Sequence, residues 1–109
     1  MEETDHNLNS ILLEGTVATL PTAFIDGGNS MAKFVVASQL NRPVIKALND
    51  SVTYKETVYV TVYAIGRLAE SSLKELKVNT KLRIVGFLTQ MWSSEVSIMA
   101  DHIELVPKK

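Results

Sequence analysis

The segment at residues 57–70 constrains the fold more than any other part of the sequence. Small or β-branched apolar residues stand at every second position, namely Val58, Val60, Val62 and Ala64. The positions between them hold Tyr59, Thr61, Tyr63 and Ile65. A period of two in β-branched and aromatic residues is typical of a strand that is buried on one face. We therefore expect the valines to face a core and both tyrosines to face away from it.

Two outward tyrosines can serve two purposes. Tyr59 and Tyr63 flank Thr61, and Arg67 follows just beyond the strand end. Rings and a guanidinium group in this order would let unpaired bases stack and would neutralise a phosphate. Alternatively, both rings pack under a loop or against a partner subunit. The segment by itself leaves both interpretations open.

The remaining periodic segments complete a small fold. Strands are predicted at 8–19, 31–39, 57–65, 81–92 and 95–106, with a helix at 67–77. Gly15 and Gly86 fall inside strands, where glycine marks a bulge, a bend or a close backbone approach. A turn is predicted at 26–30, and Asn79 is placed to end the helix. The order β-β-β-α-β-β predicts an all-β fold with one helix, a five-stranded barrel of the oligonucleotide/oligosaccharide-binding (OB) type.

Residues 40–56 show no sustained periodicity and are interpreted as a long loop or an extended hairpin tip. Long loops in compact domains are usually functional. Cations and an aromatic ring of this segment are candidates for nucleic-acid contacts: Arg42, Lys46, Tyr54 and Lys55. Asp50 and Glu56 offset part of this charge, so a merely solvated hairpin is the alternative.

The chain length predicts one domain, and the lack of cysteine fits a reducing compartment. With 109 residues, we expect a single domain at 8–106, a frayed tail at 1–7 and a short end at 107–109. The absence of cysteine excludes disulfides, cysteine-ligated zinc and a cysteine nucleophile. The acidic, polar start and the lack of a long apolar run indicate neither export nor membrane insertion. A soluble, cytoplasmic protein associated with the nucleoid is therefore expected.

Charge and motifs exclude several activities. The net charge of −1, from 11 basic and 12 acidic residues, argues against a strongly electrostatic nucleic-acid binder. His6 and His102 are the two histidines, and no carboxylate pair accompanies them. The sequence contains neither a phosphate loop of the G-x-x-x-x-G-K type nor a nucleophile with an activating base. We predict no enzymatic activity, no metal and no cofactor.

Four blocks of sequence follow one another at a characteristic spacing. They are NLNSILLEGTV from Asn7, GNSMAKFVVAS from Gly28, GRLAE from Gly66 and VSIMADHIELV from Val96. In this order they resemble the bacterial single-stranded DNA-binding proteins, from about Leu8 to Val106. The resemblance implies an OB fold and sequence-tolerant binding of single-stranded DNA in replication, recombination or repair.

The resemblance also implies roles for individual residues. Tyr59 and Trp92 match positions of base-stacking tryptophans, and Arg67 matches a basic position near DNA. Arg42 stands where another tryptophan is frequent, and a guanidinium plane can also stack on a base. The alternative for Trp92 is burial at a barrel corner or a subunit contact. The full predicted DNA-binding set is Arg42, Lys46, Tyr54, Lys55, Tyr59, Tyr63, Arg67 and Trp92.

Other positions depart from the family pattern. Ile65 replaces a stacking phenylalanine and Thr61 a frequent arginine, which lowers the expected affinity. The alternative function is therefore a protein-interaction module of a replication or restart complex, with weak or no DNA binding. Met91 and Met99 are interpreted as residues that fill gaps in the core.

The resemblance finally implies an assembly. Single-stranded DNA is the expected partner, and the chain is expected to form a homotetramer, with a dimer as the alternative. Replication proteins are further candidate partners. The family's long tail with an acidic tip does not follow Pro107. We therefore expect either a trimmed chain or a short paralogue.

Overall fold

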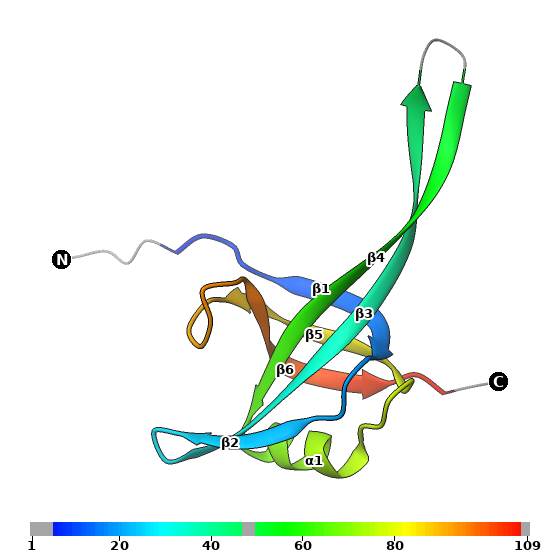
Figure 1. Cartoon of the computed structure of the whole chain (residues 1–109). Helices are drawn as coiled ribbons and strands as arrows, with labels where there is room; N and C mark the ends of the chain where they lie inside the picture. The colour runs from blue at the N-terminus through cyan, green and yellow to red at the C-terminus, as the bar shows by residue number, and fades with distance from the viewer. Residues whose placement is uncertain (1–5, 47–49, 108–109) are drawn as a thin grey trace.

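The computed structural model describes residues 6–46 and 50–107, and the side chains at 41–46 and 50–54 lie outside this description. The described residues contain six strands and one helix. The elements are β1 (Ile11–Val17), β2 (Thr22–Asp26), β3 (Asn29–Lys46), β4 (Asp50–Ile65), α1 (Arg67–Glu75), β5 (Lys81–Thr89) and β6 (Ser97–Leu105). Figure 1 shows β3 and β4 as a long arm that extends away from the other strands.

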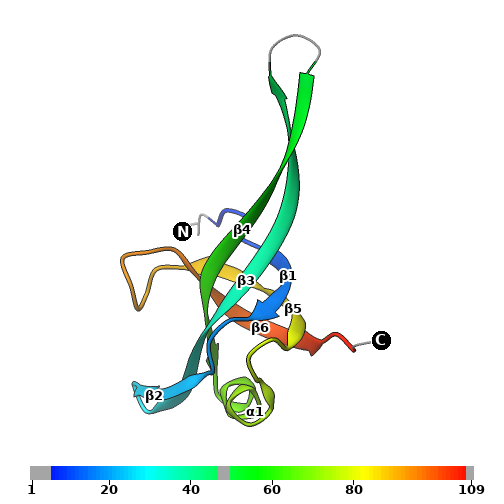
Figure 2. The ribbon, with the colours of Figure 1, turned by 45° about the vertical axis from the view of Figure 1, so that its right-hand side comes forward.

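Five of these strands close into a barrel. The hydrogen-bonded order is β1-β5-β6-β4-β3-β2, and β1 also pairs with β3 through Thr16–Ala37 and Val17–Val36. That second pairing joins the two sides of the sheet and leaves β2 outside the ring (Figure 2). The predicted five-stranded OB barrel with one helix is therefore confirmed.

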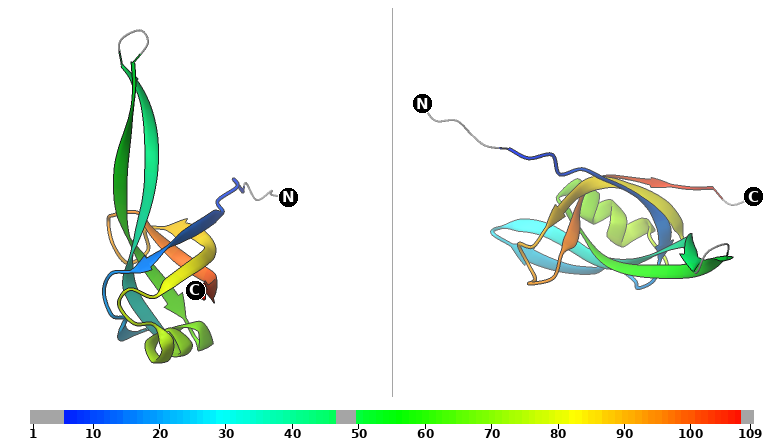
Figure 3. Two further views of the ribbon diagram at one scale, coloured as in Figure 1. Left: turned by 90° about the vertical axis from the view of Figure 1, so that its right-hand side faces the viewer. Right: turned by 90° about the horizontal axis from the view of Figure 1, so that it is seen from above.

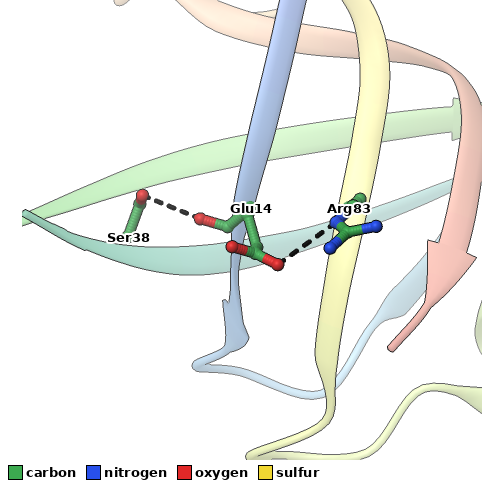
Figure 4. A network of polar contacts seen from close by, with 3 residues as sticks. All are labelled: Glu14, Ser38 and Arg83. Carbon is green, nitrogen blue, oxygen red and sulfur yellow. Dashed lines mark hydrogen bonds and ion pairs between the residues drawn. The ribbon is translucent and has the colours of Figure 1, made fainter. Parts of the chain in front are cut away.

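Polar contacts around Glu14 support the closure, as Figure 4 shows. The Ser38 hydroxyl of β3 donates to the Glu14 carbonyl oxygen over 2.8 Å, and Arg83 Nε of β5 donates to the Glu14 carboxylate over 3.2 Å. The ion pair is about half exposed and therefore contributes little free energy. The Ser38 contact continues the β1–β3 connection beyond its two paired residues.

Strand glycines allow the close approach of neighbouring backbones. A Cβ atom on Gly15 would collide with the Ala37 carbonyl, and one on Gly86 would collide with the Met99 carbonyl. The β5–β6 register also shifts between Val85 and Gly86, as at a β-bulge. The interpretation of these glycines as sites of close approach is confirmed.

The core lies inside the barrel and is covered at one end by α1 (Figure 3). It consists of Val17, Phe34, Val36, Val62, Leu76, Leu82, Ile84, Ile98 and Ala100. Val62 and Ala64 are fully buried and Val60 packs against the core, as predicted, but Val58 is 43% exposed, so its predicted burial is wrong. The chain turns after α1 at Asn79, whose φ of 76° is the left-handed conformation expected there.

β5 ends at Thr89, so the predicted strand at 81–92 is too long. Two other segments differ more strongly from the prediction. β2 was not anticipated, because four of its five residues are exposed and the segment carries little hydrophobic alternation. Residues 40–46 pair with residues 50–56 rather than forming an irregular loop: the β3–β4 register runs from Leu40–Glu56 to Lys46–Asp50. The hairpin alternative is therefore correct for this segment.

Candidate nucleic-acid interface

The outward residues of β3 and β4 form one continuous face. Residues paired directly across an antiparallel ladder lie on the same side of the sheet. Lys33 is paired with Tyr63, and Ala37 with Tyr59. Asn41 is paired with Lys55 farther along the arm. We call this surface, defined by Lys33, Lys55, Tyr59, Thr61 and Tyr63, the ribbon face.

An aromatic cluster covers the barrel end of the ribbon face. Trp92 belongs to the β5–β6 loop (residues 90–96), and its ring centroid lies 4.8 Å from that of Tyr63 at an interplanar angle of 39°. Phe24 of β2 meets Tyr63 edge-on, with centroids 6.1 Å apart and an angle of 82°. Both arrangements are favourable for aromatic pairs. Three rings from distant parts of the sequence thus form one cluster.

A shallow cleft opens beside this cluster. Its volume is about 360 Å³, and its walls are Thr22, Ala23, Phe24, Lys33, Tyr63 and Trp92. Lys33 is exposed and lines the cleft together with the aromatic rings. A cleft that combines aromatic surface with a cation can hold a flat base and balance a phosphate charge.

The indole of Trp92 is also held at its edge. Trp92 Nε1 donates a hydrogen bond of 2.8 Å to the Asp26 carboxylate at the end of β2. Figures 1 and 2 show the β5–β6 loop and the β2–β3 hairpin on the same side of the molecule. The Trp92 side chain therefore bridges two segments that are 66 residues apart.

The two predicted tyrosines differ in exposure. Tyr59 is 67% exposed, as expected for an outward residue. Tyr63 is only 3% exposed, so the expectation that its ring is exposed is wrong. Phe24 and Trp92 cover the Tyr63 ring, which agrees with the alternative that a loop packs over it.

The other predicted site residues are dispersed. Lys55 is exposed on the ribbon face. Arg67 is exposed at the start of α1, where it borders a depression shared with residues of the helix rather than the Trp92 cleft. Trp92 lies in the β5–β6 loop and not in a strand as predicted. Arg42, Lys46 and Tyr54 are on the β3–β4 arm, but their side chains lie outside the described part of the structure.

The sequence did not predict two residues that line the cleft or the residue that accepts the Trp92 hydrogen bond. Phe24, Asp26 and Lys33 were not predicted, although Phe24 and Lys33 flank the predicted turn at 26–30. An aromatic residue and a lysine on either side of a two-glycine turn would have been the signal. Met91 is 74% exposed next to Trp92, so its interpretation as a core residue is wrong.

The described residues contain no cluster of three or more His, Asp or Glu side chains suited to a metal ion. Within the same residues, the helix is too short to cross a membrane.

Comparisons with known proteins place the chain in a family. The model of the single-strand binding protein family matches residues 8–106. A search of curated proteins finds no similar sequence. The family consists of non-enzymatic DNA-binding proteins, in agreement with the prediction that the chain is not an enzyme.

Solved structures share the fold. A small single-stranded DNA-binding protein from Streptomyces coelicolor matches with a TM-score of 0.73 and 21% identity, over 94% of this chain and 95% of that one. The SSB domain of a Synechococcus protein matches with a TM-score of 0.67 and 16% identity, over 93% and 99% of the two chains. Because the family model matches nearly its whole length, the chain belongs to the single-strand binding protein family.

Proposed function

We propose that the protein binds single-stranded DNA with little sequence preference and acts in replication, recombination or repair. Bases stack on Trp92 and Tyr59, and cations of the ribbon face and the β3–β4 arm neutralise phosphates. Every base has a flat aromatic face, so stacking tolerates any sequence. Membership of the single-strand binding protein family supports the ligand class.

One observation carries the proposed mechanism. The indole of Trp92 packs on Tyr63 beside an open cleft that is also lined by Lys33. Tyr59 stands four residues from Tyr63 on the same strand, which is about 13 Å at roughly 3.3 Å per residue. The two stacking positions are thus far enough apart to hold different bases of one strand.

A titration with oligo-dT tests the proposal. Trp92 is the single tryptophan of the chain, so fluorescence excited at a wavelength that tyrosine does not absorb reports on this cleft alone. We expect oligo-dT to quench it at low salt, because a stacked base contacts the indole directly. If oligo-dT causes no quenching and no gel shift at low salt, DNA binding is rejected and the protein-interaction alternative is favoured.

The same titration at several salt concentrations measures the electrostatic contribution. For an oligo-dT short enough to contact one protomer, roughly two to four phosphate contacts predict that log Kobs falls against log salt with a slope of roughly −1 to −3. We expect this shallow slope because the chain is nearly neutral, with a net charge of −1. A slope steeper than about −5 would contradict it, since more phosphates would be engaged than this face has cations to contact.

We also propose that the chain forms a homotetramer. Leu12 of β1 and Val85 of β5 are paired directly and are 76% and 41% exposed on the outside of the barrel. Adjacent exposed apolar side chains support an interface with another copy. Light scattering is expected to give four times the chain mass of 12.0 kDa. A monomer mass across the micromolar range would reject the assembly.

A further inference from the structure

We propose that Asp26 is a positioning residue, which holds the Trp92 indole in the orientation that receives a base. This inference rests on the proposed DNA binding and adds to it a residue that does not itself stack. The contact is the 2.8 Å hydrogen bond from Trp92 Nε1 to the Asp26 carboxylate. A hydrogen bond to a charged acceptor is stronger than a neutral one, so it is suited to restrain a half-buried ring at the surface.

Asp26 is itself well anchored. It is the last residue of β2, whose five residues all pair with β3, and its own partner is Asn29. The two residues between them, Gly27 and Gly28, have φ values of 58° and 82°. Positive φ at both positions is typical of a tight type I′ hairpin turn, a conformation that glycine adopts without strain. The carboxylate therefore projects from a short, regular hairpin.

The β5–β6 loop needs an external restraint. Two of its hydrogen bonds lie within the loop: Gln90 Nε2 donates to the Ser94 carbonyl, and Glu95 N donates to the Ser93 hydroxyl. A third, from Met91 N to the Thr89 hydroxyl, reaches only the last residue of β5. These bonds shape the loop without joining it to the barrel surface. Trp92 makes that connection through Tyr63 beneath its ring and Asp26 at its edge.

The charge of Asp26 supports a positioning role. A carboxylate beside a surface that binds a polyanion opposes binding through like-charge repulsion. The hydrogen bond to Asp26 compensates for this repulsion, because an indole that is already oriented loses less side-chain freedom when a base stacks on it. Lys33 lines the cleft next to Trp92 and supplies a positive charge on this side of the molecule.

Two variants separate the hydrogen bond from the charge. Asp26→Asn and Asp26→Ala both remove the negative charge, but asparagine retains a side-chain oxygen that can accept from the indole. We expect the Asn variant to bind labelled oligo-dT about three- to tenfold more tightly than the Ala variant, the range that one hydrogen bond supports. Fluorescence anisotropy of the labelled oligonucleotide measures both affinities.

The Trp92→Phe background supplies the control. Phenylalanine keeps an aromatic face and has no N–H group, so the difference between Asn and Ala at position 26 should disappear. In the free proteins with Trp92 intact, acrylamide should quench the indole more strongly in Asp26→Ala than in Asp26→Asn. This readout reports on restraint of the ring without DNA.

The outcomes distinguish this proposal from the function on which it rests. If the wild-type protein does not bind oligo-dT, the proposed function fails, and the role of Asp26 in receiving a base fails with it. If wild-type binding is intact but the Asn and Ala variants bind equally, the positioning role alone is rejected. An undiminished difference in the Trp92→Phe background also rejects it, because Asp26 would then act through another group.

Discussion

Replacement of both Tyr59 and Trp92 with alanine is expected to weaken binding of oligo-dT by a factor of roughly 30 to more than 10,000. Each stacked base contributes about 1–3 kcal/mol by alanine substitution. Tyr59 lies on the ribbon face and Trp92 in the β5–β6 loop, so the two rings are separate and their contributions should be nearly additive. Because the double variant lacks tryptophan, anisotropy of a labelled oligonucleotide is the measurement of choice.

The double replacement with phenylalanine is the matched control. Phenylalanine retains a ring face at both positions, and most of the affinity should therefore remain. The mass of each variant must equal that of the wild-type protein, so that a change of assembly is not read as a change of binding. A loss of less than about threefold in the alanine variant would show that bases do not stack at these positions.

Tyr63→Ala is expected to lower the free energy of unfolding by about 3–5 kcal/mol, as for other buried aromatic residues. The ring is 3% exposed and lies between Phe24 and Trp92, so truncation removes both aromatic contacts and leaves a cavity. Urea denaturation at one fixed protein concentration measures the change, because the stability of an oligomer depends on concentration.

Tyr63→Phe separates support from DNA contact. It keeps the ring, and both stability and oligo-dT affinity should stay within about 1 kcal/mol of the wild-type values. A large loss of affinity with unchanged stability would instead indicate that the hydroxyl group reaches the DNA. A small effect of Tyr63→Ala on unfolding would contradict the supporting role of the ring.

The β3–β4 arm shows where periodicity stops being informative. Inside the barrel, one face of each strand meets the core, and the sequence alternates accordingly at Val60, Val62 and Ala64. Beyond the barrel the two strands continue to pair with each other, as at Leu40–Glu56, without a core to enforce alternation. The pairing depends on backbone hydrogen bonds, which any residue except proline can donate. Residues 40–56 therefore carry little strand signal.

The sequence identified those residues of the candidate site whose own side chains, aromatic or cationic, suggest contact with nucleic acid. Tyr59 was singled out by strand periodicity and Trp92 by the family resemblance, and both are accessible in the structure: Tyr59 is 67% exposed, and Trp92 lines the cleft. Phe24, Asp26 and Lys33 were missed, because their relation to Trp92 exists only after the β2 hairpin folds beside the β5–β6 loop. No local spacing in the sequence encodes a contact between residues 66 positions apart.

The sequence by itself determined the barrel: its strand periods, its internal glycines and its helix all reflect local backbone preferences and one-sided burial. Which of two similar tyrosines stays exposed was decided only by the tertiary structure. Periodicity assigns Tyr59 and Tyr63 to the same face, but it does not say what covers that face. Phe24 and Trp92 cover one ring and leave the other in solvent, because the segments that carry them pack over only one end of the strand.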